Sequence, residues 1–275
     1  MPQALSFHKM HALGNDFVVM NTMTQAILFE KPLIQHLANR HMGIGCDQLL
    51  LIETSRHADF GCRIFNADGS EAEQCGNGIR CVARFVHEEQ FIQSKSISFE
   101  TKAGISHILI KDYDNIQVSM GMPIFEPADI PFLIEKSSNI YELTDVSPDQ
   151  LTVLSMGNPH AIVQVPSLKE YPVAEIGAKM AVHPAFPAGT NSGFIEVINR
   201  QHIRLRTFER GSGETFACGS NACAAVVAGI KNGWLDSVVR VELTYGELLI
   251  EWQGDQNSVL MTGPATSVFT GIIDI

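Results

Sequence analysis

The stretch that decides the fold reads CRIFNADGSEAEQCGNGI at residues 62–79, and LRTFERGSGETFACGSNA at residues 205–222 repeats its pattern. The copies align without a gap at an offset of 143, since 218 − 75 = 143. Each copy carries a cysteine followed by glycine, Cys75-Gly76 and Cys218-Gly219, where a helix is expected to begin. A register held across polar turn residues indicates an internal duplication.

The same register extends well beyond these segments. It pairs Asn15 with Asn158 and Gln48 with Asn191, and after a one-residue deletion the offset becomes 142. The duplication predicts two lobes. The N-terminal lobe is expected to span residues 1–121, with 264–275 packing on it, and the C-terminal lobe residues 122–263. The Pro-rich stretch 123–131 is the expected crossover between them.

Each lobe is predicted to combine short strands with one central helix. Apolar residues recur at helical spacing after Cys75 and again after Cys218. Short β-rich runs separated by turn residues lie at 97–101, 105–110 and 116–120, and at 238–243, 248–252 and 259–262. The expected class is α+β, with two pseudo-symmetric lobes. Each lobe would be a mixed or antiparallel, β-barrel-like sheet around a central helix, with the active site between the lobes.

The net charge, the apolar runs and the number of cysteines exclude several classes of protein. A net charge of −11 without a concentrated basic face argues against a nucleic-acid partner. Residues 1–9 lack the pattern of a signal peptide, and no apolar run is long enough to span a membrane. We therefore expect a cytoplasmic protein with no membrane partner. The six cysteines are too few and too irregular for a disulfide scaffold, so free thiols are expected.

Cys75 and Cys218 are the candidate catalytic residues. A helix N-terminus offers unpaired N–H groups and partial positive charge, which stabilise a thiolate and also hold a carboxylate. Glycine at the next position lets a ligand approach the backbone closely. Two matched thiols on two matched lobes could face one substrate from opposite sides, as inversion of a carbon centre requires.

Other functions for the cysteines stay open. A zinc site is poorly supported, because the sequence has no CxxC pair and no HExxH spacing, and we expect no metal. A hydrolase nucleophile would need one cysteine and would leave the second Cys-Gly copy unexplained. A thiol redox protein would cycle a Cys75–Cys218 disulfide during turnover. A binding protein that has lost catalysis is a further alternative.

Taken together, the motifs resemble the diaminopimelate epimerase family. The motifs that carry the resemblance span nearly the whole chain in order: GNDF at 14–17, FNADGS at 65–70, CGNGIRC at 75–81, MGNPH at 156–160, ERGSGET at 209–215 and ACGS at 217–220. The resemblance implies a pyridoxal-independent, cofactor-free isomerase of lysine biosynthesis that interconverts LL- and meso-2,6-diaminopimelate. Proline racemases and hydroxyproline epimerases, which share the two-cysteine plan, are the nearest alternative.

The resemblance also implies residue roles. Cys75 and Cys218 would exchange the roles of base and acid, His160 and Glu209 would tune the thiol pKa values, and Phe269 would lie at the interface of a homodimer. A guanidinium such as that of Arg210 binds a carboxylate bidentately. The residues expected to bind the amino-acid substrate are Asn15, Gln48, Asn66, Gly76, Asn77, Asn158, Asn191, Glu209, Arg210, Gly219 and Ser220.

The sequence departs from the family pattern in two places. Ser192-Gly193 follows Asn191, where family members usually carry valine and a polar residue. Asn221 follows Cys218-Gly219-Ser220, where a glycine is usual. The helix entry after the second cysteine is therefore expected to be less permissive.

Overall fold

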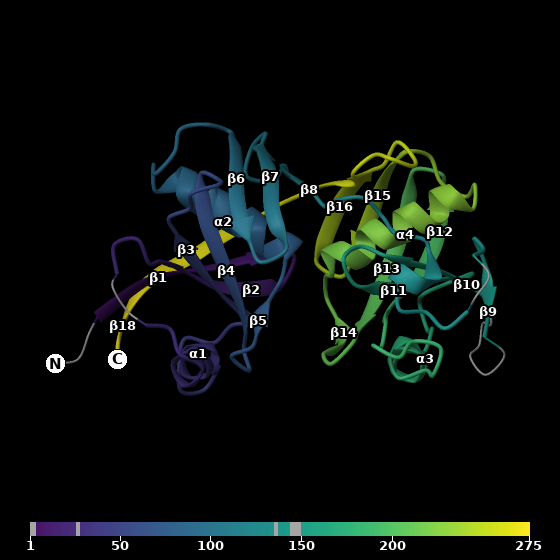
Figure 1. Cartoon of the computed structure of the whole chain (residues 1–275), viewed down its shortest axis with the longest axis horizontal. Helices are drawn as coiled ribbons and strands as arrows, with labels where there is room; N and C mark the ends of the chain where they lie inside the picture. Colours follow the sequence, from purple (N-terminus) through teal and green to yellow (C-terminus); the bar gives the residue numbers. More distant parts are fainter. Residues whose placement is uncertain (1–3, 26–27, 135–136, 144–149) are drawn as a thin grey trace. The chain divides into compact units, whose positions relative to one another are not determined.

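A computed structural model describes residues 4–25, 28–134, 137–143 and 150–275. Residues 1–3, the first part of the segment expected to lack a signal peptide, lie outside the described residues. The chain divides into two compact units, residues 1–118 with 263–275, and residues 119–262 (Figure 1). In the parts that the structure describes, every helix falls short of the length and hydropathy that crossing a membrane requires.

In the residues that the structure describes, the first unit is a mixed sheet with two helices. Its strands pair in the order β18–β1–β2–β3–β4–β6–β7–β8, with β2–β3 and β4–β6 parallel and the other pairs antiparallel. The long helix α2 contacts β1, β2, β3, β4, β7 and β18, so it is the central helix of this unit. The elements are β1 (Ala4–Ala12), β2 (Asn15–Asn21), α1 (Lys31–Ala38), β3 (Gln48–Glu53), β4 (Phe60–Asn66), β5 (Glu71–Ala72), α2 (Gly76–Glu88), β6 (Ser96–Thr101), β7 (Gly104–Ile110), β8 (Ile116–Ser119) and β18 (Thr266–Asp274).

The second unit repeats this arrangement. Its strands pair in the order β9–β10–β11–β12–β13–β15–β16–β17, with β11–β12 and β13–β15 parallel. Helix α4 contacts β10, β11, β12, β13, β15 and β16 and is its central helix. The elements are η1 (Pro127–Asp129), β9 (Tyr141–Glu142), β10 (Gln150–Ser155), β11 (Pro159–Gln164), α3 (Val173–Ala181), β12 (Asn191–Asn199), β13 (His202–Glu209), β14 (Gly213–Thr215), α4 (Gly219–Lys231), β15 (Val238–Leu243), β16 (Gly246–Glu251) and β17 (Leu260–Gly263).

One ion pair is repeated at equivalent positions of the two units. Arg63 Nε on β4 donates to Glu71 Oε1 on β5 at 2.8 Å, and Arg206 Nε on β13 donates to Glu214 Oε1 on β14 at 2.7 Å. The predicted α+β class with two similar lobes is confirmed, and the six β-rich runs are strands β6, β7, β8, β15, β16 and β17.

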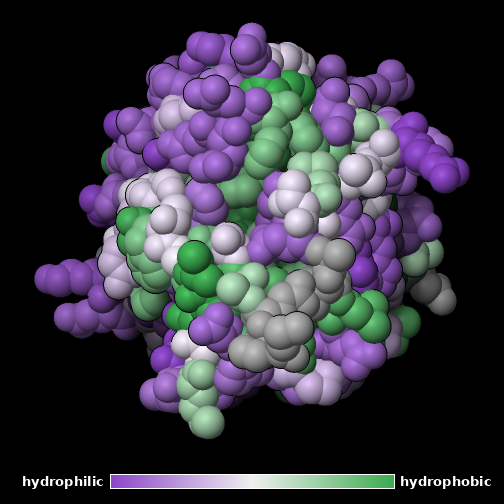
Figure 2. Space-filling model, turned by 90° about the vertical axis from the view of Figure 1, so that its left-hand side faces the viewer, coloured by the Kyte–Doolittle hydropathy of each residue, from purple (hydrophilic) through white to green (hydrophobic). Residues whose placement is uncertain are grey.

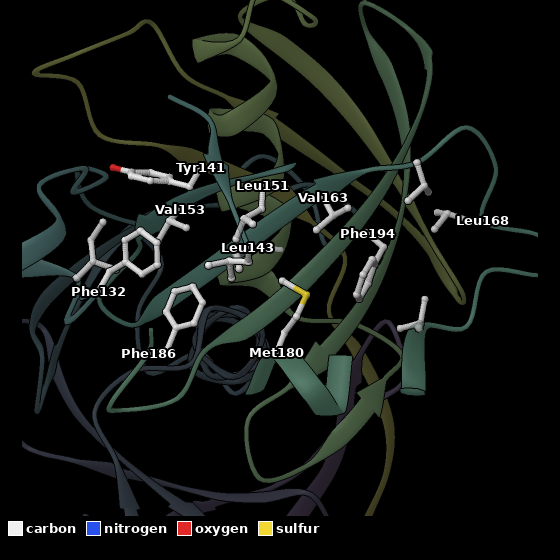
Figure 3. Packing of buried hydrophobic residues seen from close by; sticks show 14 residues of the cluster. Phe132, Tyr141, Leu143, Leu151, Val153, Val163, Leu168, Met180, Phe186 and Phe194 are labelled. Carbon is white, nitrogen blue, oxygen red and sulfur yellow. The ribbon is translucent and has the colours of Figure 1, made fainter. Parts of the chain in front are cut away.

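Each unit buries its own apolar core. In the second unit, Phe132 and Phe186 stack at a centroid distance of 4.8 Å, and Met180 of α3 packs with Phe194 of β12 in the same cluster (Figure 3). In the first unit, α1 covers a matching cluster that includes Leu37 and Phe65. Burying each large apolar side chain contributes about 1.5–3 kcal/mol, so these cores hold the sheets that carry the polar site residues.

The Pro-rich stretch 123–131 is not the crossover that the sequence predicts. It lies inside the second unit, where Ile124 bridges to Ser155 and Ile130 is completely buried in the core. Prolines mark an irregular backbone path there, but Ile130 between two of them packs into the core of the second unit. The chain passes from the first unit to the second at residues 118 and 119, three residues before the predicted boundary, since 121 − 118 = 3.

Candidate active site

Cys75 is the N-cap of α2. Its backbone is extended (φ −148°, ψ 104°), and its Sγ accepts a hydrogen bond from the N–H of Gly78 at 3.3 Å. The sulfur thus takes one of the N–H groups that a helix start leaves without a partner. A Cβ at Gly78 would lie 3.2 Å from Leu50 Cδ2 and 3.4 Å from Cys75 Sγ. Glycine at this position keeps the first turn close to both neighbours.

Two amide side chains lie beside Cys75. Asn15 begins β2 after a tight turn in which Leu13 and Gly14 have φ of 54° and 87°. Its Oδ1 accepts a hydrogen bond from Asn77 Nδ2 at 3.2 Å and lies 4.0 Å from Cys75 Sγ. Asn77 is the second residue of α2 and is buried. The structure therefore brings Asn15, Asn77 and Cys75 together, as expected.

Gln48 and Asn66 form the second amide pair of this unit. They face each other across β3 and β4, and Gln48 Nε2 donates to Asn66 Oδ1 at 2.9 Å. Asn66 Nδ2 donates in turn to Ser70 Oγ at 3.0 Å. Within the described residues, the buried Gln48 Oε1 has no hydrogen-bond partner. A buried acceptor without a partner is uncommon, and an ordered water or ion is one group that can satisfy it.

A carboxylate network that the sequence reasoning missed supports Asn15. Asp47 Oδ2 accepts from Asn15 Nδ2 at 2.9 Å, and Arg40 Nη2 donates to Asp16 Oδ1 at 2.6 Å and to Asp47 Oδ1 at 2.8 Å. Lys9 Nζ also donates to Asp16. Burial acts to raise the pKa of Asp16, but the hydrogen bonds from Arg40 and Lys9 outweigh it and hold this pKa at about 2. The signal available in the sequence was the position of Asp16 directly after Asn15.

Cys218 is the N-cap of α4 and is more deeply buried, with 7% of its surface exposed. Its Sγ lies 3.4 Å from Ser220 Oγ, and Glu209, whose Oε1 accepts from Thr215 Oγ1 at 2.5 Å, lies close by. Burial raises the pKa of the Cys218 thiol well above its usual range, and the negative charge of Glu209 raises it further. Cys218 is therefore held as a neutral thiol.

His160 joins two of the expected amide residues. It is completely buried on β11, faces Asn191 across the ladder with β12, and donates from Nε2 to Asn158 Oδ1 at 3.0 Å. Burial, followed by the positive charge of Arg210, lowers the pKa of His160 to about 3, so the ring is neutral. Asn191 Oδ1 accepts from the backbone N–H of Arg210 at 2.9 Å. The guanidinium of Arg210 is exposed and donates to Ala188 O.

In the first unit the structure places Asn15 and Asn77 beside Cys75 and pairs Gln48 with Asn66. In the second unit it places Glu209 and Ser220 near Cys218 and pairs His160 with Asn158 and Asn191 with the backbone of Arg210. Phe269, the expected interface residue, lies on β18 with 50% of its surface exposed, and its ring packs edge-on against Phe7 at 6.1 Å. Among the residues that the structure describes, no three His, Cys, Asp or Glu side chains are arranged to hold a metal ion.

The sequence matches the family model for diaminopimelate epimerase over residues 7–126 and 152–268. The diaminopimelate epimerase of Nitrosomonas europaea is 47% identical over 273 residues, which is 98% of this chain and 99% of that protein.

Two solved structures are similar in fold. A PhzF-family phenazine biosynthesis protein from Bacillus anthracis has a TM-score of 0.70 and 18% identity, covering 99% of this chain and 100% of its own. A hydroxyproline epimerase from Agrobacterium vitis has a TM-score of 0.69 and 16% identity, covering 99% and 93%. At these identities the likeness supports the fold alone.

Proposed function

The chain belongs to the diaminopimelate epimerase family, and on that premise we propose that it interconverts LL- and meso-2,6-diaminopimelate by proton transfer between Cys75 and Cys218. It is an isomerase of lysine biosynthesis. The observation that carries the two-cysteine mechanism is the shared position of the two thiols. Each is the N-cap of the central helix in its unit, 143 residues apart (218 − 75).

In the proposed reaction, a thiolate takes the proton from the substrate α-carbon, so that a C–H bond breaks and an S–H bond forms. The thiol on the opposite face then gives its proton to the carbanion, and the configuration inverts. No electrons are exchanged with a cofactor. Because burial and Glu209 keep Cys218 protonated, Cys218 is the proton donor of the resting enzyme and Cys75 the base. After one turnover the roles are exchanged.

The carbanion must be stabilised through the α-carboxylate. The first N–H groups of α2 and α4, at Gly76, Asn77, Gly219 and Ser220, are oriented donors at helix N-termini. Such donors favour developing negative charge without reorganising during the reaction. This supports a mechanism in which the two helix starts hold the reacting end of the substrate.

The remaining site residues are proposed to recognise the rest of the substrate. Arg210 would bind a carboxylate and Glu209 an ammonium group. The repeat places Glu209 where the first unit has Asn66, since 209 − 143 = 66, so charge recognition differs between the units. The other amides proposed to contact substrate are Asn15, Gln48, Asn158 and Asn191.

The test is epimerisation in D₂O with reductant and no added cofactor. With LL-diaminopimelate we expect the meso isomer to form with deuterium at the inverted α-carbon. Cys75→Ala and Cys218→Ala should each abolish net epimerisation, while Cys46→Ala, a buried cysteine in the apolar core of the first unit, should keep it. Wild-type turnover in either site variant would overturn the two-base mechanism. Exchange with proline and none with diaminopimelate would favour the proline racemase alternative.

We further propose that the protein is a homodimer that pairs through β18. In the described part of the chain the strand register of β18 is with β1, at the end of the strand order of its unit. Val268, Phe269 and Ile272 on this strand are 54%, 50% and 71% exposed. Figure 2 looks on the side of the molecule where Figure 1 labels β18, and it shows hydrophobic side chains gathered between hydrophilic ones. Open edges with apolar side chains favour pairing with another strand.

Because the mechanism needs two reduced thiols, we also propose a cytoplasmic location.

A further inference from the structure

Asn221 is a completely buried polar residue in the first turn of α4, three positions after Cys218. Its Nδ2 donates to the backbone oxygen of Ser192 on β12 at 3.0 Å. Its own backbone N–H interacts with the Cys218 thiol and acts to lower the pKa of that thiol, against the larger effect of burial. One residue therefore joins the strand that carries Asn191 to the helix start that carries Cys218.

Gly193 makes room for this side chain. A Cβ at Gly193 would lie 2.2 Å from Asn221 Oδ1 and 2.8 Å from Ile162 Cδ1. No larger residue fits there unless Asn221 moves. Glycine inside a strand weakens the strand and marks a close approach. Gly193, which belongs to the first departure from the family pattern, and Asn221, which is the second, thus form one packing arrangement.

The first unit fills the equivalent space in the opposite way. The repeat places Gly193 on Leu50 (193 − 143 = 50) and Asn221 on Gly78 (221 − 143 = 78). A Cβ at Gly78 would lie 3.2 Å from Leu50 Cδ2. The large side chain therefore comes from the strand in the first unit and from the helix in the second.

The residue that faces this strand position across the ladder also differs between the units: it is apolar in the first unit and polar in the second. Gly193 faces Thr207 in the β12–β13 ladder, and Leu50 faces Ile64 in the β3–β4 ladder, with 207 − 143 = 64. Cross-strand partners point to the same face of a sheet, so the Thr207 hydroxyl lies on the side of Asn221. Both Thr207 Oγ1 and Asn221 Oδ1 are buried, and neither has a hydrogen-bond partner within the described residues. A rotatable hydroxyl is the donor that such an acceptor requires.

We propose that Asn221 is a positioning residue for Cys218, held by Ser192, Gly193 and Thr207. Its amide links the first turn of α4 to β12, and one ordered water joins the Thr207 hydroxyl to its Oδ1. The proposal rests on the proposed function only for the role of Cys218 in proton transfer. It implies that the helix position three residues after each thiol is supported by different chemistry: Gly78 packs against Leu50 in the first unit, and the buried amide of Asn221 bonds to β12 in the second.

Packing is tested first by a double-mutant cycle that needs no substrate. The variants are Asn221→Gly, Gly193→Leu and the double variant, which recreates the Gly78–Leu50 pair of the first unit. Each single change should lower the Tm, and the double variant should recover at least half of the summed loss. Strictly additive losses would overturn the coupling between the two positions.

Positioning of the thiol is tested by the pH dependence of Cys218 alkylation with iodoacetamide, followed by mass spectrometry. Asn221→Gly should be alkylated faster and at lower pH, because Cys218 becomes better solvated. The kcat should fall about tenfold to a hundredfold, as for a displaced reacting group, with KM changed less than about twofold. Ala224→Gly, in the next turn of α4, is the matched control and should leave the alkylation profile unchanged.

Thr207→Val removes the hydroxyl with little change of shape, so it gives the same readout if Asn221→Gly does not fold. It should shift alkylation in the same direction by a smaller factor. A wild-type alkylation profile and kcat in both variants would overturn the positioning role. If the wild type lacks epimerase activity, the proposed function fails, but the unfolding cycle and alkylation profiles still test the packing and the thiol.

Discussion

Acid should destabilise the second unit through His160. This ring is completely buried, donates its one N–H to Asn158, and has no partner for Nδ1 within the described residues. Burial and the charge of Arg210 lower its pKa to about 3. Protonating the folded protein would place a second cation beside Arg210 without a solvent shell, whereas the unfolded chain accepts the proton near pH 6.5.

The folded pKa is the lower one, so stability from His160 is present above about pH 6.5 and is lost as pH falls toward 3. At pH 4 an unfolded histidine favours the protonated form by about three hundredfold, whereas the folded one is about one tenth protonated. The free energy of unfolding should therefore fall by about 3 kcal/mol between pH 7 and pH 4 from this residue alone.

Urea unfolding followed by tryptophan fluorescence measures this loss, because Trp234 and Trp252 both lie in the second unit. The wild type should lose about 3 kcal/mol more than His160→Gln between pH 7 and pH 4. Arg210→Met should reduce the loss only modestly, because burial is the larger cause of the shift. Equal pH dependence in wild type and His160→Gln, or an NMR titration of His160 near pH 6.5, would refute the reasoning.

Two further outcomes are expected. Glu209→Gln should lower the pKa of Cys218, because it removes a negative charge that disfavours the thiolate; the pH profile of Cys218 alkylation measures this, and an unchanged or raised pKa would contradict it. Phe269→Glu should convert the proposed homodimer to monomers by placing charge on the exposed apolar face of β18, and sedimentation at micromolar concentration should show half the wild-type mass. An unchanged mass would argue against this interface.

Much of the fold was predictable because its signals are local. Strand runs, the helical spacing after each cysteine and the repeat offset depend on neighbouring residues and on register, and all correspond to observed elements. The Pro-rich stretch 123–131 was mispredicted because proline reports backbone shape, while burial of Ile130 depends on packing from distant strands.

Some features of the candidate site were likewise predictable from the sequence, and others were not. The repeat identified both thiols and paired the amides, because duplicated sequence preserves equivalent positions. It could not show that Asp16 is held at low pKa by Lys9 and Arg40, since these charges meet only in the folded sheet.

The sequence by itself determined that the chain is a duplicated α+β protein with a Cys-Gly pair at the start of each central helix. Only the tertiary structure decided how each thiol is supported. The Cys75 sulfur accepts a hydrogen bond from the N–H of Gly78, and Gly78 packs against Leu50. Cys218 is buried close to Glu209, and the nearby Asn221 side chain occupies the space that the missing side chain of Gly193 leaves. The physical reason is that hydrogen-bond partners, desolvation and steric fit arise from residues far apart in sequence. Two similar segments can therefore hold chemically different thiols.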